Sequence, residues 1–119
     1  MERDDIMKLL ADRLNDNRYM LLGLAKYEHN FDRSPSKMQL MDYANKLYEK
    51  AVEQGIETPE NPEQPLIGSR HVLDVYAAKL EGAGLVNVEE IGRVRVFRLS
   101  KFGRELLQYI QEKELHNQT

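Results

Sequence analysis

The chain has 119 residues, of which 41% are hydrophobic and 31% are charged, and its formal net charge is −3. This composition is typical of a folded protein with one domain, 1–119, and differs from that of disordered chains. The absence of cysteine excludes disulfides, thiolate metal sites and a cysteine nucleophile. Apolar runs are short and the first residues are acidic, so we expect no membrane span, no secretory signal and a cytoplasmic location.

The charges are distributed unevenly along the chain. Residues 1–68 contain 9 basic and 13 acidic side chains, residues 69–104 contain 7 and 4, and residues 105–119 contain 1 and 3. Only the middle segment is basic, with 7 basic against 4 acidic residues giving +3. A basic segment on an otherwise acidic protein is expected of a face that contacts phosphate groups.

The first 33 residues predict two N-terminal helices. Apolar residues recur at helical spacing from Asp4 to Leu14. The cap-forming run Asn15-Asp16-Asn17 predicts a break, with Asn15 or Asp16 capping a second helix that ends near His29. This second helix is apolar on more than one side, which favours a position in the core or in a dimer interface.

A third helix is predicted from Ser34 to about Gln54. Ser34 is expected to cap it, and Pro35 suits its first position, where no N–H is needed. An apolar stripe continues to position 52, and Gly55 is placed to end the helix. Residues 55–67 contain three prolines and no periodicity, so they predict a loop that is long for a compact domain and either projects from the body or covers part of it.

Residues 69–104 carry the most informative pattern of the chain. A helix capped by Ser69 runs to about residue 81, and Gly82 and Gly84 end it. Two strands follow, 86–88 and 94–99, joined by a turn at Ile91-Gly92, and Ser100 opens a final helix. Helix, hairpin and helix in this order predict a winged helix-turn-helix. The expected fold class is α+β, mostly α, with N-terminal helices (1–33), helix-turn-helix and wing (34–99), a C-terminal helix (100–115) and a frayed tail (116–119).

The segment 36–99 resembles the C-terminal winged-helix domain of archaeal origin-recognition initiators of the Orc/Cdc type. The similar residues include Leu80-Glu81-Gly82-Ala83-Gly84-Leu85-Val86, and Gly92-Arg93 leading to Val96-Phe97-Arg98-Leu99. The chain has no Gly-x-x-x-x-Gly-Lys-Ser/Thr motif, so the resemblance does not imply the initiators' ATPase activity. Residues 97–107, Phe97-Arg98-Leu99-Ser100-Lys101-Phe102-Gly103-Arg104-Glu105-Leu106-Leu107, are similar instead to regulators of the MarR and PadR kind. That resemblance implies a final helix that builds a homodimer.

The pattern predicts a sequence-specific double-stranded DNA-binding protein, a small transcriptional regulator that acts by occupying its site. The helix 69–81 is expected to enter the major groove, with its N-terminal residues nearest the base edges. The wing arginines are expected to reach a flanking phosphate or the minor groove, and the start of the final helix to contact the backbone. The candidate DNA-binding residues are Arg70, His71, Asp74, Lys79, Arg93, Arg95, Lys101 and Arg104.

An alternative is a protein-docking winged helix in a replication, transcription or mobile-element complex. The outward face of the 69–81 helix includes Asp74, Val75 and Ala78, which suit a protein partner as well as DNA. Glu89 and Glu90 on the wing would repel phosphates. The partner would bind through the 69–81 helix or the 55–67 loop.

Neither an enzyme nor a cofactor site is predicted. Ser34, Ser69 and Ser100 each precede a helix and fit N-caps better than nucleophiles. The three histidines are scattered along the chain, which does not favour a metal site.

Overall fold

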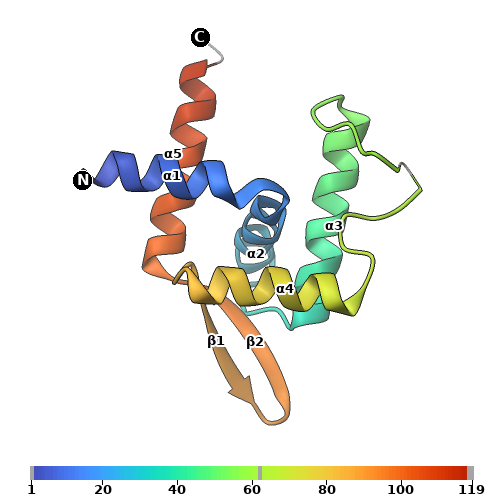
Figure 1. Cartoon of the computed structure of the whole chain (residues 1–119). Helices are drawn as coiled ribbons and strands as arrows, with labels where there is room; N and C mark the ends of the chain where they lie inside the picture. Colours follow the sequence, from blue (N-terminus) through green and yellow to red (C-terminus); the bar gives the residue numbers. More distant parts are fainter. Residues whose placement is uncertain (1, 62, 118–119) are drawn as a thin grey trace.

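The computed structural model describes residues 2–61 and 63–117, and side chains as far as Lys113. Five α-helices and a two-stranded antiparallel sheet follow in the order α1, η1, α2, α3, α4, β1, β2, α5 (Figure 1). Their bounds are α1 Arg3–Leu14, the 3₁₀ turn η1 Asn15–Asn17, α2 Arg18–Phe31, α3 Lys37–Glu53, α4 Arg70–Gly82, β1 Val86–Ile91, β2 Val94–Leu99 and α5 Lys101–Asn117. The predicted fold class, α+β, mostly α and of winged-helix type, is confirmed.

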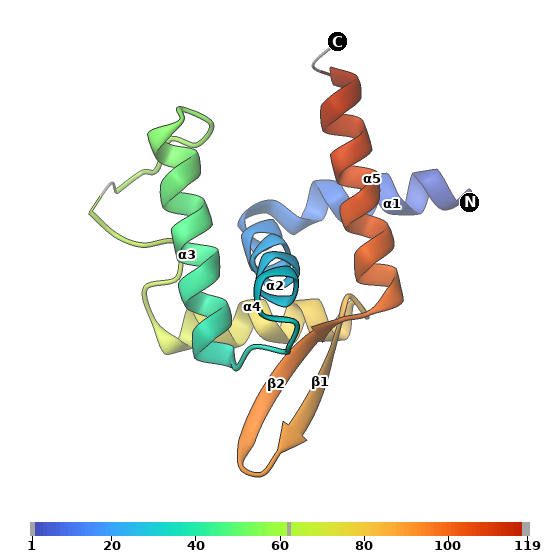
Figure 2. The same ribbon diagram turned by 180° about the vertical axis from the view of Figure 1, so that it is seen from behind.

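Helix α2 is central, as its two-sided apolar pattern predicts. Met20, Leu21 and Leu24 are fully buried, and α3, α4 and α5 surround the helix (Figures 1 and 2). One hydrophobic core joins residues from all five helices and both strands. Within the described ranges, we find no helix long and apolar enough to cross a lipid bilayer.

The start of α3 differs from the prediction. Ser36, not Ser34, caps the helix: its hydroxyl accepts a hydrogen bond from the Gln39 N–H, and the Gln39 side chain accepts one from the Ser36 N–H. This reciprocal arrangement is a capping box. Pro35 lies outside the helix because its carbonyl oxygen accepts a 2.9 Å hydrogen bond from the Phe97 N–H of β2.

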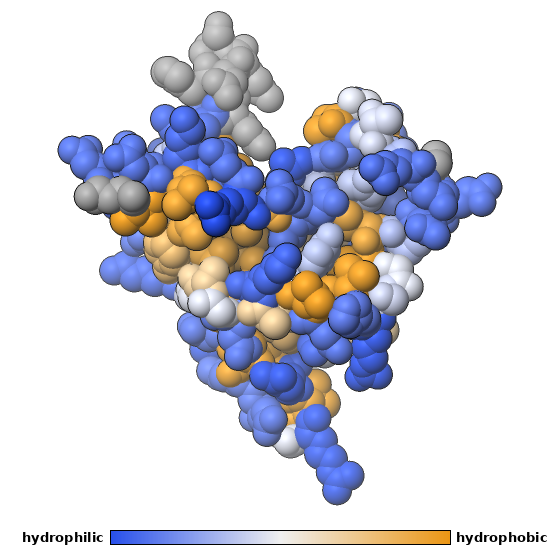
Figure 3. Space-filling model, in the orientation of Figure 1, coloured by the Kyte–Doolittle hydropathy of each residue, from blue (hydrophilic) through white to orange (hydrophobic). Residues whose placement is uncertain are grey.

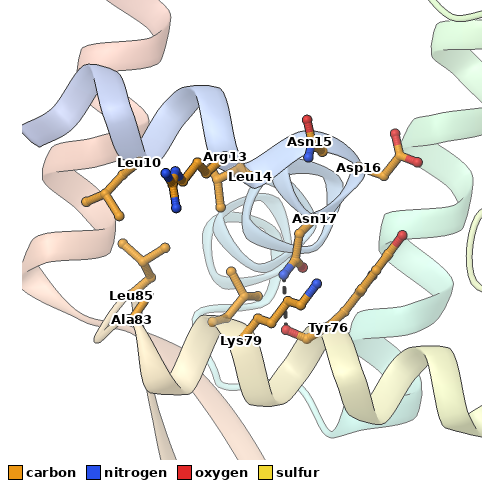
Figure 4. Close-up of a pocket in the computed structure, with 11 residues that line it drawn as sticks. Leu10, Arg13, Leu14, Asn15, Asp16, Asn17, Tyr76, Lys79, Ala83 and Leu85 are labelled. Carbon is orange, nitrogen blue, oxygen red and sulfur yellow. Dashed lines mark hydrogen bonds between the residues drawn. The ribbon is translucent and has the colours of Figure 1, made fainter.

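The break between α1 and α2 is present, but its predicted cap is wrong. Neither Asn15 nor Asp16 caps α2 through its side chain; Asn15 instead turns the chain with a φ of 49°. The second helix also ends later than expected, at Phe31, with Asp32 in the left-handed conformation. Asn17 is buried and directs its side chain toward α4 (Figure 4).

The ends of the 55–67 loop are held against the body. Arg18 and the Tyr19 hydroxyl both bond the Glu57 carboxylate, which fixes the start of the loop to α2. At the other end, the Asn45 side chain accepts a 2.8 Å hydrogen bond from the Ile67 N–H and donates to its carbonyl oxygen. Both ends of the loop are therefore held to the body, and residues 60, 61 and 63–65 between them are exposed. As predicted, Gly55 follows α3, in a conformation with φ of 76°.

Helix α5 extends to Asn117, two residues beyond the predicted end at 115, and the fraying of the tail 116–119 stays a prediction. The last two residues of that tail, 118–119, lie outside the described residues. Leu106 and Leu107 are buried, and Phe102, Tyr109 and Ile110 pack partly buried against the core. The apolar face predicted for this helix is confirmed, and Leu107 adds to it.

Candidate nucleic-acid interface

Helix α4 has one buried face and one exposed face. The Ser69 hydroxyl accepts a hydrogen bond from the Val72 N–H and so caps the helix, as predicted. Leu73, Ala77 and Leu80 are buried, which leaves the opposite face open to solvent. This helix lies across one side of the molecule, and the hairpin of β1 and β2 projects beyond the body from its C-terminal end (Figure 1). The molecule thus presents a helix and a wing side by side.

The wing is anchored at its base and exposed at its tip. Phe97 and Leu99 are 2% and 5% exposed and hold β2 to the core, as their alternation predicts. Just before α3, Ser36 forms an isolated antiparallel bridge with Val96 of β2. At the tip, Ile91 pairs with Val94 across a turn in which Gly92 has a φ of 66°. The turn places Arg93 at the outermost point of the hairpin.

A groove runs between α4 and the wing, and two ion pairs cross it. Lys37 Nζ lies 2.7 Å from Asp74 Oδ1, and Arg95 Nη2 lies 3.7 Å from Glu81 Oε2. In both pairs the carboxylate belongs to α4 and the cation to another element. The groove is lined by Lys37, Asp74, Ala77, Ala78, Glu81, Gly82, Arg95 and Phe97.

The Asp74 carboxyl group has a lowered pKa. The main cause is its hydrogen bond with Lys37, and the nearby charges of Arg70 and His71 act in the same direction. A lowered pKa in the folded state means that the ion pair persists at neutral pH and is lost only as the pH falls through that lowered value. At neutral pH the groove beside α4 therefore carries balanced charge.

The chain is 30% identical over 114 residues to the DNA-binding protein TubR of Bacillus cereus (strain ATCC 10987 / NRS 248). The match covers 95% of this chain and 89% of that protein. The chain belongs to the TubR family. No family model matches it. Since 95% of this TubR-family chain lies within the match, α4 and the wing are part of what the two proteins share.

All eight candidate residues are exposed in this TubR-family protein, and the structure brings six of them to α4 and the wing. Four lie on α4 itself, Arg95 reaches α4 through Glu81, and Arg93 lies at the wing tip. Within residues 2–61 and 63–113, no carboxylate is ion-paired with Arg70, Lys79 or Arg93. These three cations are free to contact an anionic partner.

The other two candidates belong to a different part of the structure. Lys101 and Arg104 lie in the first turn of α5, and Arg104 Nη2 is 3.2 Å from Glu28 Oε2. Glu28 also accepts a 2.8 Å hydrogen bond from the Leu99 N–H, so it joins α2, β2 and α5. Arg104 shares a depression with Arg33 and Arg98 at the connector between α2 and α3, which lies behind α4 (Figure 2). The structure therefore does not bring Arg104 together with the α4 residues.

Sequence reasoning missed Lys37. It is the first residue of α3, and its ammonium group lies in the groove between α4 and the wing. The signal that could have found it is Ser36-Lys37-Met38-Gln39, which has the spacing of a capping box. The part of the chain that the structure describes contains no group of three histidine or carboxylate side chains placed to hold a metal ion.

Proposed function

We propose that this protein binds double-stranded DNA in a sequence-specific manner, with α4 in the major groove and the wing beside it. One observation carries the proposal. Three cations, Arg70 and Lys79 on α4 and Arg93 on the wing, have no ion-pair partner among the described side chains and lie along adjoining exposed elements of a winged-helix fold. Kinship to a protein whose name describes it as DNA-binding supports the same partner for this chain.

The first turn of α4 is the part we assign to base recognition. Arg70 and His71 are exposed immediately after the Ser69 cap, where the helix end is free to approach base edges. Arginine recognises guanine through O6 and N7, and a carboxylate such as Asp74 accepts from cytosine N4. Lys79, two turns further along the exposed face, contacts a phosphate group.

The wing supplies contacts beside the major groove. Arg93 extends from the tip toward a flanking phosphate or the minor groove. Arg95 is partly neutralised by Glu81, so we assign it a smaller share of the affinity. Lys101 is exposed at the start of α5 and contacts the backbone; Arg104 does so only if it exchanges Glu28 for a phosphate.

We further propose that the protein is a cytoplasmic homodimer and a small transcriptional regulator that acts by occupancy of its site. Exposed apolar side chains on α1 support a second copy as partner, since Ile6 and Leu9 are 39% and 46% exposed. An apolar area near α1 and the neighbouring part of α5 is visible on the front face (Figure 3). A two-fold dimer that places its α4 helices about 34 Å apart predicts a pseudo-palindromic site.

The alternative function, docking on a protein, is supported by the balanced charge of the groove beside α4. Asp74 and Glu81 offset Lys37 and Arg95, and Glu89 offsets Arg98 at 3.3 Å. A face with paired charges and small apolar residues fits a protein surface as well as a phosphate backbone.

Fluorescence anisotropy on random duplex DNA across a salt series tests the proposal. We expect binding that weakens linearly in log salt, and a shallower slope for Arg93→Ala/Arg95→Ala, because each lost phosphate contact reduces the slope by about 0.9. Lys8→Ala/Lys50→Ala, which removes two exposed cations from α1 and α3, is the matched control. If no binding is seen even at low salt, DNA is not the partner. A pull-down that uses this protein as bait then tests whether the α4 face binds a protein.

A further inference from the structure

A pocket of about 310 Å³ lies on the side of α4 away from the wing, where α1 and η1 cross it (Figure 4). Leu10, Leu14, Leu80 and Leu85 give it an apolar wall, and the side chains of Asn17 from η1 and Lys79 from α4 lie beside them. The pocket is lined by Leu10, Arg13, Leu14, Asn15, Asp16, Asn17, Tyr76, Lys79, Leu80, Ala83 and Leu85.

Asn17 presents an unused hydrogen-bond acceptor at this pocket. The residue is 5% exposed, and its Nδ2 donates a 3.1 Å hydrogen bond to the carbonyl oxygen of Tyr76. That bond fixes the amide orientation, because the flipped amide would place two oxygen atoms against each other. Oδ1 is left buried, with no donor among the described residues. Since buried polar groups are nearly always paired, this oxygen calls for a donor that the described residues do not supply.

Two cations line the same pocket. Arg13 enters it from α1 and Lys79 from α4, and both side chains belong to exposed residues (Figure 4). Neither is ion-paired within the described part of the chain. The carboxylate of Asp16 points away from the pair, toward the side of the Tyr76 ring (Figure 4). The pocket thus combines an apolar wall, two free cations and one orphaned acceptor.

We propose that this pocket binds a small organic anion that carries a hydroxyl or amide donor. Its carboxylate contacts Arg13 and Lys79, its apolar body lies on the leucines, and its donor bonds Asn17 Oδ1. Because that oxygen is covered in the structure, side chains that line the pocket must move before the ligand reaches it. The ligand therefore engages α4 at two points, through Lys79 and through the Asn17–Tyr76 bond.

This engagement makes the ligand an effector of DNA binding, a step that rests on the proposed function. Lys79 lies on the exposed surface of α4, where we assign it a phosphate contact. A ligand carboxylate bound to Lys79 competes for the same ammonium group. We expect saturation of the pocket to weaken DNA binding by about threefold to tenfold, as loss of one phosphate contact does.

The first test uses 4-hydroxybenzoate as probe and the ¹⁵N-labelled full chain, observed by NMR without DNA. We expect saturable millimolar binding that shifts the Asn17 side-chain amide and the residues lining the pocket. Benzoate, which lacks the donor, and 4-hydroxybenzyl alcohol, which lacks the anion, should each bind about tenfold more weakly. Equal affinity for all three compounds, shifts scattered over the surface, or no binding overturns the proposed site.

Variants separate the two interactions. Lys79→Gln and Arg13→Gln should remove the preference for the anion, and Asn17→Leu should remove the preference for the hydroxyl. Lys26→Gln, an exposed cation on α2, should bind as the wild type does. Unchanged preferences in the Lys79→Gln and Arg13→Gln proteins contradict the proposed contacts, even if Asn17→Leu fails to fold.

The regulatory step has its own readout. Anisotropy on duplex DNA is repeated with saturating 4-hydroxybenzoate, with sodium chloride at the same concentration as control for ionic strength. A fall in affinity with the former alone supports the effector role, and no fall overturns it. If the protein binds no DNA under any condition, the proposed function fails while the NMR result on the pocket still stands.

Discussion

Lys37, the first residue of α3, donates a 2.7 Å hydrogen bond to the carboxylate of Asp74 on α4. The bond joins the two helices of the helix-turn-helix, which the long 55–67 segment separates in the sequence. The bond also pairs Asp74, an acidic residue of the proposed recognition helix α4, with a cation from α3. The electrostatic character of the α4 face thus depends on partners that lie outside α4.

The Lys37–Asp74 pair predicts opposite effects for its two members. Lys37→Gln leaves the Asp74 carboxylate unneutralised beside the DNA, so nonspecific affinity should fall by about twofold to fivefold. Asp74→Asn removes that carboxylate and frees Lys37 for a phosphate, so affinity should rise and the salt slope should steepen by up to about 0.9. Anisotropy across a salt series on random duplex DNA measures both. Affinity changes of the same sign in the two variants would contradict this role for the pair.

Glu81 restrains Arg95 in the same groove, 3.7 Å across from it. Glu81→Gln should release Arg95 and raise nonspecific DNA affinity by about twofold to fivefold, because one repulsive charge is lost and one cation is gained. The same substitution in an Arg95→Gln background should give a smaller gain. Glu53→Gln, at the end of α3, provides a control for net charge alone. Equal gains from Glu81→Gln and Glu53→Gln would assign the effect to net charge rather than to Arg95.

Features set by local periodicity were predicted well from the sequence. The alternation that buries Phe97 and Leu99 and the stripe that buries Leu73, Ala77 and Leu80 each lie within one element. Such patterns are visible without knowledge of the neighbours. The turn at Gly92 and the helix end at Gly55 are local in the same sense, because each needs a residue that tolerates positive φ.

Features set by distant partners were not predictable in this way. In the sequence, a helix could begin at Ser34-Pro35 or at Ser36-x-x-Gln39. The structure begins it at Ser36, because the Pro35 carbonyl oxygen is hydrogen-bonded to the Phe97 N–H of β2. Similarly, Asn17 is drawn to α4 by a carbonyl group 59 residues away. The pairing of Arg104 with Glu28 also depends on the tertiary fold, and it separates this candidate from the α4 face.

Gly103, in the first turn of α5, lies against Leu85 in the connection between α4 and β1, and it has no room for a side chain. A Cβ at this position would overlap the backbone carbonyl oxygen of Leu85, which already accepts a 3.1 Å hydrogen bond from the Ser100 N–H. Gly103→Ala should therefore destabilise the fold by about 1–3 kcal/mol, despite the higher helix propensity of alanine. Urea denaturation followed by circular dichroism measures the loss.

Gly82 is the matched control for Gly103, because a Cβ there meets no atom within 4 Å. Gly82→Ala, at the last residue of α4, should leave stability unchanged or raise it by up to about 1 kcal/mol. If both alanine variants unfold at the wild-type urea concentration, close packing at Gly103 is not what holds α5 to Leu85.

Tyr19 on α2 contacts the start of the 55–67 loop through Glu57. Its hydroxyl donates a 2.8 Å hydrogen bond to Glu57, which also pairs with Arg18, and its ring packs edge-on against Tyr48 with centroids 5.3 Å apart. Burial raises the pKa of the Tyr19 hydroxyl above its ordinary value. The fold therefore prefers the protonated phenol.

The raised pKa of Tyr19 predicts a loss of stability at alkaline pH. Its contribution is fully present below the unfolded-state pKa, about 10, and is lost as the pH rises through the higher folded-state pKa. Tyr19→Phe should cost about 1 kcal/mol at pH 7, because the hydrogen bond to Glu57 is lost, and should then lose less stability than the wild type above pH 10. Urea midpoints at a series of pH values measure both effects. A decline above pH 10 as steep as that of the wild type would mean that Tyr19 does not couple its ionisation to folding.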